Sequence, residues 1–238
     1  MLEFQVCLNF SIYNSMLMIP VTWTHHFDTD APDYTVNPAW MNRVEVVVDQ
    51  ALATGFWVVL NVHHDSWGWM DYASGASIPV IEAKFGKLWS QIGTRFKCKS
   101  SKLIFEAINE PTGSTEAHAI ELNKLNDIFL TSINVAGGNN PQRVVSLSGL
   151  NQDPTRTSQW FQRGTLYPNQ PWALQFHYYS PYDFIFNAWG RTVWGSAADK
   201  ALLTSEFQLI KGNFTNVPTF IGEWDASPQN TETTGRWA

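Results

Sequence analysis

The sequence predicts an α/β fold with a parallel sheet, and three observations lead to this class. Short apolar segments alternate with longer segments of helical periodicity along most of the 238 residues. This alternation is typical of parallel strands joined by helical crossovers. Several apolar segments are followed directly by His, Asn, Glu or Trp. Because polar residues recur after many strands and not at one switch point, we expect a (β/α)8 TIM barrel rather than an open doubly wound sheet.

Six segments are expected to form the strands of this sheet. Phe56–Val62, for example, is a nearly continuous apolar run, as expected for a strand that is covered on both faces. The six segments are Met16–Val21, Phe56–Val62, Leu103–Ile108, Arg143–Leu147, Trp172–Phe176 and Val217–Ile221. A further strand is expected near Phe4–Phe10.

Four helices are expected between these strands. The first begins at Asn37-Pro38, which reads as an N-cap followed by proline at the first helical position, and it ends at Gly55. The others are expected at about Ile81–Phe96, Glu116–Ala136 and Ala197–Ile210.

The predicted elements fall short of a complete barrel. A full barrel usually needs about 250 residues, and the chain ends at Ala238, soon after the last predicted strand. We therefore expect an incomplete barrel whose first strand, within Met1–Leu17, is divergent and whose last βα unit is missing. No linker or internal repeat is visible, so residues 1–238 are expected to form a single domain.

Composition narrows the classes of partner. The net charge of −6 argues against nucleic acid and against anionic membranes, and no apolar run approaches the ~20 residues of a membrane span. The 12 Trp, 7 Tyr and 15 Phe residues are the unusual feature of the composition. Aromatic rings stack on the apolar faces of sugars, so this content favours a carbohydrate ligand.

We expect the protein to be a monomer. The sequons at Asn9 and Asn213 favour a secreted protein, although no signal peptide is visible.

Two glutamates are candidates for catalysis. Glu110 and Glu223 each follow a predicted strand, so a barrel would bring both to the same rim. Glycoside hydrolysis needs two carboxyl groups on either side of the scissile bond, of which one is protonated and the other ionised. Glu106 shares a strand face with Glu110 but lies deeper, and we interpret it as a structural, hydrogen-bonded residue.

Four motifs resemble glycoside hydrolase family 5, in that family's order and at fitting spacings. They are NVHHDSW (Asn61–Trp67), LIFEAINEP (Leu103–Pro111), HYYSPY (His177–Tyr182) and FIGEW (Phe220–Trp224). The resemblance extends from about Ile19 onward. It implies a retaining endo-β-1,4-glucanase, or cellulase, that needs no metal and no organic cofactor and that acts on a β-glucan polysaccharide.

The resemblance also implies roles for individual residues. Glu110 looks like the acid/base and Glu223 like the nucleophile. Asn109 looks like the asparagine that binds the sugar 2-hydroxyl, and the Tyr179 hydroxyl would bind the nucleophile, which favours its ionised form and a low pKa. The remaining candidates for substrate binding are His63, His64, His177, Trp23, Trp67 and Trp224.

Two departures from the family pattern bear on these expectations. The family usually carries an arginine in its second strand, where this chain has Met18. The tryptophan of the family's eighth strand would lie beyond Ala238. We therefore expect a partial or mis-spliced gene product with altered activity.

Other functions remain open. The pairs His25-His26 and His63-His64, with Asp65, could ligate a metal, but adjacent strand residues point to opposite faces and chelate poorly. A serine hydrolase would need a Gly-x-Ser-x-Gly elbow, which the sequence lacks. A barrel that binds glucan without cutting it is the alternative from another class. Among enzymes, mannan, xyloglucan and mixed-linkage β-glucan are the alternative substrates.

Overall fold

The computed structural model describes residues 5–7, 16–186 and 191–225. These residues form one seven-stranded sheet in which the strands follow each other in sequence order. The strands are β1 (Gln5–Cys7), β2 (Met16–Ile19), β3 (Trp57–Asn61), β4 (Leu103–Glu106), β5 (Val145–Leu147), β6 (Trp172–Tyr178) and β7 (Thr219–Trp224). All six strands predicted between Met16 and Ile221 are therefore present.

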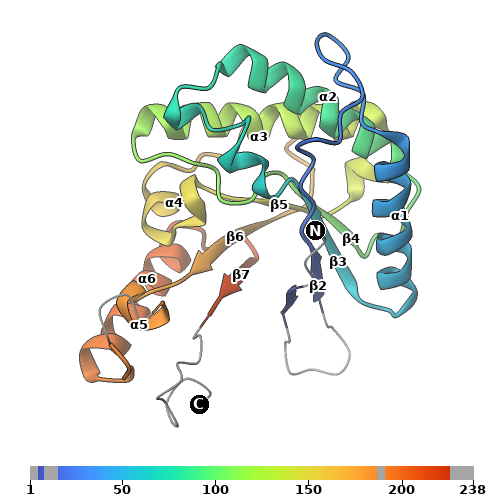
Figure 1. Ribbon diagram of the computed structural model, residues 1–238. Helices are drawn as coiled ribbons and strands as arrows, with labels where there is room; N and C mark the ends of the chain where they lie inside the picture. The colour runs from blue at the N-terminus through green and yellow to red at the C-terminus, as the bar shows by residue number, and fades with distance from the viewer. Residues whose placement is uncertain (1–4, 8–15, 187–190, 226–238) are drawn as a thin grey trace.

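Strands β2 to β7 are parallel to their neighbours, whereas β1 pairs antiparallel with β2. No pairing joins β7 to β1 or β2 among the described residues. The sheet is therefore a curled, open part of a (β/α)8 barrel, as predicted (Figure 1). The antiparallel direction of β1 confirms that the start of the chain diverges from a barrel strand. The rest of the segment predicted as a strand near Phe4–Phe10, with the sequon at Asn9, lies outside the described residues.

The helices lie along the outside of the curled sheet (Figure 1). They are α1 (Pro38–Ala53), α2 (Ile78–Phe96), α3 (Glu116–Ala136), α4 (Pro154–Trp160), α5 (Tyr182–Ile185) and α6 (Ala197–Asn213). The predicted N-cap is confirmed, because the Asn37 side chain accepts a hydrogen bond from the Trp40 N–H. The short helices α4 and α5 were not predicted, since a helix of one or two turns shows too few apolar repeats.

The two faces of the sheet differ in chemistry. On the outer face, residues such as Leu60 and Phe105 pack against the helices in the main core, which contains Trp89 and Phe129. The alternate residues point to the concave face, where Met18, Val59 and Ile104 form a smaller apolar cluster. The position at which the family usually has an arginine is therefore filled here by a buried thioether in an apolar layer.

The last two strands are longer than predicted. β6 continues through His177 to Tyr178, and β7 continues through Glu223 to Trp224. His177 and Glu223 thus lie within hydrogen-bonded strands and not just beyond them, which is a correction to the prediction. Their backbone pairing explains the difference, because a strand lasts as long as its neighbour supplies ladder partners.

Among the described residues, none of the helices combines the length and apolar character that crossing a membrane requires. Cys98 is an exposed free thiol, while the side chain of Cys7 lies outside the described residues. The second sequon residue, Asn213, is the last residue of α6 and is exposed.

Candidate active site

Three side chains meet at the carboxyl end of the sheet, one from the segment after β4 and one each from β6 and β7. The ligand atoms of Glu110, His177 and Glu223 all lie within 4.8 Å of one another. The His177 Nδ1 atom is 2.8 Å from a carboxylate oxygen of Glu110 and 3.4 Å from one of Glu223. The two glutamates, which are distant in sequence, therefore face each other across a single imidazole, as the barrel prediction required.

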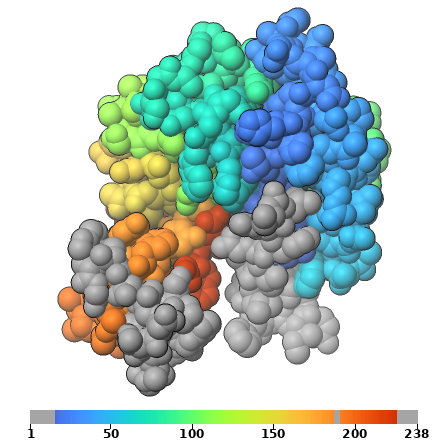
Figure 2. All heavy atoms as spheres, viewed as in Figure 1, coloured from blue at the N-terminus to red at the C-terminus, as the bar shows by residue number. Residues whose placement is uncertain are grey.

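Strand pairing brings Glu223 beside His177. In the register of β6 and β7, His177 is opposite Glu223, after an irregularity at Phe176/His177. The residue before the glutamate is Gly222, where a β-carbon would collide with the Gln175 side chain. Only glycine therefore fits at this point of close approach. In Figure 2, the red atoms near the end of the described chain lie against orange atoms of the preceding part of the chain.

A chain of hydrogen bonds defines the orientation of the imidazole. The Ser146 hydroxyl donates to Gln175 Oε1 at 2.8 Å, so the Gln175 amide nitrogen is free to donate toward His177 Nε2 at 3.3 Å. His177 Nε2 is then an acceptor and Nδ1 carries the proton, which it donates to Glu110. Polar residues inside buried strands thus set the tautomer of His177.

Glu223 is buried, and its surroundings change its acidity. Burial raises the pKa of Glu223 above its ordinary value, while His177 and the Tyr179 hydrogen bond oppose the shift. The Tyr179 hydroxyl donates to Glu223 Oε2 at 2.9 Å, which confirms the predicted contact. The low pKa expected for Glu223 is wrong, however, because desolvation of the carboxylate outweighs the hydrogen bond. With Met18 in its apolar cluster, the arginine that would offset this desolvation is missing.

Glu110 has an unusual backbone conformation. Its φ angle is +41°, in the left-handed region that costs a non-glycine residue about 1–2 kcal/mol. Its N–H group donates to Gln152 Oε1 at 2.6 Å and not to a neighbouring strand. Strain of this kind needs support from the surrounding structure, and here that support comes from the turn after β5.

The other predicted residues divide into two groups. His63 and His64 lie beside each other, with ring centroids 4.5 Å apart, and His64 stacks on Trp67 at 4.7 Å. Trp67 and Trp224 are 52% and 64% exposed, so both have ring surface available for stacking. Trp23, by contrast, is fully buried and donates its indole N–H to the Asn61 carbonyl. Its prediction as a sugar-stacking residue is therefore wrong, because packing in the core covers both faces of its ring.

The segment that carries His63 is held in place by Asp65. This buried carboxylate accepts hydrogen bonds from the Trp23 N–H, the Thr24 hydroxyl and the Trp69 indole, at 2.7–2.8 Å. Asp65 is thus fully occupied in joining two loops. Burial lowers the pKa of His63 to about 3, so its imidazole is neutral.

Among the described residues, one group has the geometry to hold a metal ion, and it is the same Glu110, His177 and Glu223. The metal ligands considered from sequence, His25-His26 and His63-His64 with Asp65, form no such group in this part of the chain. Since His177 Nδ1 already donates to Glu110, a metal ion would first have to displace that proton.

Two buried residues beneath the carboxylates have unpaired atoms. Asn109 is 1% exposed, and its Oδ1 has no partner among the described residues. Glu106 is equally buried and accepts a hydrogen bond from Asn61 Nδ2 at 3.2 Å, which confirms the predicted structural role. Burial raises the pKa of Glu106 to about 7.

A pocket of about 330 Å³ opens beside Glu110. It lies between the turn after β5 and the segment after β6, and its lining includes Arg156, Tyr179, Tyr182 and Glu206. Phe186 packs against both Tyr179 and Tyr182, with ring centroids 5.5 and 4.7 Å apart. This side of the site is therefore rich in aromatic and charged groups.

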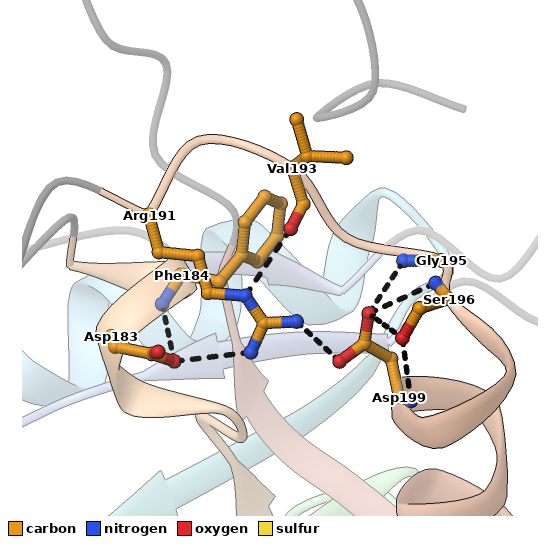
Figure 3. Close-up of polar contacts among 7 residues, drawn as sticks. All are labelled: Asp183, Phe184, Arg191, Val193, Gly195, Ser196 and Asp199. Atoms are coloured by element: carbon orange, nitrogen blue, oxygen red, sulfur yellow. Dashed lines mark hydrogen bonds and ion pairs between the residues drawn. The ribbon is translucent and has the colours of Figure 1, made fainter.

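The segment that carries Tyr182 and Phe186 is held in place by a cluster of ionic contacts. Arg191 lies between Asp183 of α5 and Asp199 of α6, and it also donates to the Val193 carbonyl (Figure 3). Asp199 in turn accepts from the Gly195 and Ser196 N–H groups, which forms the N-terminal cap of α6. The cluster ties α5 to α6 beside the site.

Sequence reasoning missed four polar residues that organise the site: Asn61, Ser146, Gln152 and Gln175. Three of them, all except Gln152, are polar residues within predicted buried strands, which is the signal that identified Glu106. Gln152 carries no such signal, because it lies in a turn and only the fold places it against Glu110.

Comparisons with known proteins agree with this geometry. A model of cellulase, glycosyl hydrolase family 5, matches residues 14–238. The cellulase/esterase CelE of Acetivibrio thermocellus is 34% identical over 229 residues, which cover 89% of this chain and 27% of that protein. A tri-modular subfamily 4 endo-β-1,4-glucanase from Bacillus licheniformis, solved with cellotetraose, superposes with a TM-score of 0.82 at 40% identity. That alignment covers 92% of this chain and 42% of the other.

A family 5 xyloglucanase from Paenibacillus pabuli superposes with the same TM-score of 0.82 at 28% identity, covering 91% of this chain and 69% of the other. The chain spans about a quarter of the length of CelE. The match to the family nevertheless covers nearly all of this chain, including each motif that carries Glu110, His177 and Glu223. The chain therefore belongs to the cellulase family, glycosyl hydrolase family 5.

Proposed function

We propose that the protein is an endo-β-1,4-glucanase that cleaves internal glucosidic bonds of cellulose with retention of configuration. The observation that carries this proposal is the pair of carboxylates, Glu110 and Glu223, whose oxygens lie within 4.8 Å of each other. Retaining glycosidases place their carboxyl groups ~5–5.5 Å apart, whereas inverting enzymes need ~6.5–9.5 Å to admit a water molecule. The spacing supports direct attack by one carboxylate.

In the proposed mechanism, Glu110 donates a proton to the glycosidic oxygen while ionised Glu223 attacks the anomeric carbon. The bond to the leaving sugar breaks, and a covalent glycosyl-enzyme forms. Glu110, now ionised, then removes a proton from water, which attacks the same carbon and releases Glu223. The bond from Tyr179 to Glu223 favours the ionised nucleophile. His177 orients both carboxylates through its Nδ1–H.

The substrate is proposed to lie across the carboxyl end of the sheet, between a cluster of aromatic residues after β3 and the aromatic pocket beside Glu110. His63, His64 and the exposed Trp67 lie at the end of β3, and the pocket beside Glu110 lies on the β5–β6 side. Asn109 has a buried Oδ1 without a described partner, which fits a group that binds a sugar hydroxyl. Trp224, on β7, is exposed beside Glu223 and is proposed to stack on a glucosyl ring. We also propose that the protein is secreted and monomeric.

The test is the release of reducing sugar from carboxymethyl cellulose by the wild type and by Glu110→Gln. We expect the variant to lose at least ~10²-fold in rate, the lower end of what one general acid contributes. Chromatography of early products distinguishes internal cleavage from release of short ends. Absence of any hydrolysis by the wild type would contradict the proposal and favour a glucan-binding protein that does not cut.

Xyloglucan is the second candidate substrate, because one relative with the same superposition is a xyloglucanase. Mannan and mixed-linkage β-glucan use the same chemistry. Measuring kcat/KM of the wild type on each of these polysaccharides ranks them as substrates.

A further inference from the structure

The turn between β5 and α4 contacts the segment after β4 at two points. The Glu110 N–H donates to Gln152 Oε1 at 2.6 Å, and the Asn151 N–H donates to the Pro111 carbonyl at 2.8 Å. Asn151 and Gln152 themselves have φ angles of +56° and +52°. Three non-glycine residues in the left-handed region thus face each other across two hydrogen bonds.

The turn is itself held by α4. Arg156 donates to the Asn151 side chain and, at 3.1 Å, to the Gly113 carbonyl. Asp153 caps α4 by accepting from the Arg156 N–H at 2.8 Å. Arg156 therefore joins the turn, at Asn151, to the chain that follows Glu110, at Gly113. The backbone of Glu110 is therefore fixed by the fold and cannot relax independently of α4.

Gln152 is poorly suited to a purely structural role. Its side chain is fully buried, and its Nε2 has no hydrogen-bond partner among the described residues. An unpaired buried donor is unfavourable, so an apolar side chain of equal size would be the better filler. What the glutamine supplies is one acceptor, directed at the N–H of Glu110.

From this geometry, we propose that Gln152 is a positioning residue for Glu110. His177 fixes one carboxylate oxygen of Glu110, and Gln152 fixes its backbone. Together they determine where the other oxygen points, and hence the path of the proton to the glycosidic bond. The proposal rests on the proposed function, since it presupposes that Glu110 is the acid/base.

The test compares two substrates that differ in their need for a proton. Cellotetraose has a poor leaving group, whereas 2,4-dinitrophenyl β-cellobioside releases a phenolate that needs no protonation. Gln152→Met keeps the volume and removes the acceptor. We expect it to lose ~10–10²-fold in kcat on cellotetraose, as a misplaced catalytic group does, while the pre-steady-state burst on the aryl glycoside stays within about 3-fold of wild type.

Gln152→Glu keeps the accepting oxygen and is the rescue variant. We expect it to recover most of the activity on cellotetraose and to move the alkaline limb of the pH–rate profile upward, because an added carboxyl group disfavours ionisation of Glu110. Gln159→Met is the matched control, since Gln159 is an exposed glutamine on α4. Thermal unfolding followed by circular dichroism shows whether each variant is folded.

Equal losses on both substrates, or full activity of Gln152→Met on cellotetraose, would overturn the proposal. Glu110→Gln and Glu223→Gln are assayed beside these variants. If both retain activity, the proposed function itself fails. If both lose activity while Gln152→Met does not, only the positioning role of Gln152 is contradicted.

Discussion

The two sides of the site use buried polar groups in different ways. At the end of β3, Asp65 has each carboxylate oxygen occupied by donors from neighbouring loops. At the ends of β4 to β7, Glu110 and Glu223 share one imidazole, and nearby atoms of Asn109 and Gln152 have no described partner. Buried polar groups are normally paired. The paired set therefore holds the loops together, whereas the unpaired atoms next to Glu110 are consistent with the proposed substrate site.

Removing the carboxylate of Glu223, the proposed nucleophile, is expected to have the largest effect at the ends of β4 to β7. Glu223→Gln is expected to lower kcat on carboxymethyl cellulose on the order of 10⁴-fold or more, because covalent catalysis is lost while the fold is kept. Reducing-sugar release measures the effect. Glu121→Gln, on the outer helix α3, is the control and is expected to retain activity. A Glu223→Gln variant with near wild-type activity would show that Glu223 is not the nucleophile.

Removing Asp65 tests the hydrogen-bonded loops at the end of β3, and here the effect is expected on the stability of the fold. Asp65→Ala leaves three donors without their acceptor, of which the Trp23 N–H is fully buried. We expect the free energy of unfolding to fall by about 3 kcal/mol or more, as measured by urea titration. Asp33→Ala removes an exposed carboxylate and is the control. An unchanged denaturation midpoint for Asp65→Ala would contradict the structural role of this residue.

Tyr179→Phe sharpens the comparison by removing one hydrogen bond on the catalytic side. Loss of the hydroxyl that donates to Glu223 raises the pKa of that carboxyl further above its ordinary value. Because the proposed nucleophile must be ionised, the acid limb of the kcat/KM profile is expected to shift to higher pH. We expect a loss of about 10-fold below that limb. Tyr167→Phe, at a partly buried tyrosine between α4 and β6, is the control. An unshifted acid limb would refute the prediction.

Glu106→Gln tests the buried layer beneath the two carboxylates, and its effect is expected on the pH dependence of stability. The pKa of Glu106 is about 7 in the folded protein, against ~4.3 in an unfolded chain. Between these values Glu106 binds more protons in the folded state, so its contribution to the free energy of unfolding is greatest below pH ~4.3 and is lost as pH rises through 7. The contribution to the slope is at most about 1.4 kcal/mol per pH unit.

In Glu106→Gln this contribution to the slope is expected to vanish between about pH 5 and 7, while the bond from Asn61 is kept. Urea titrations at several pH values measure the slope. Glu116→Gln, at the exposed start of α3, should leave the slope in that range unchanged. A variant slope equal to that of the wild type would show that Glu106 does not titrate in this interval.

The sequence by itself determined the order of strands and helices, the open barrel and the two glutamates. Apolar periodicity indicates which faces of the elements are buried, and polar residues after buried strands indicate which side chains lie at the carboxyl end of the sheet. The tertiary structure decided the tautomer of His177, the raised pKa of Glu223, the burial of Trp23 and the contact between Gln152 and Glu110. These features depend on how completely each group is removed from water and on which distant side chain faces it, and a single sequence does not encode those distances locally.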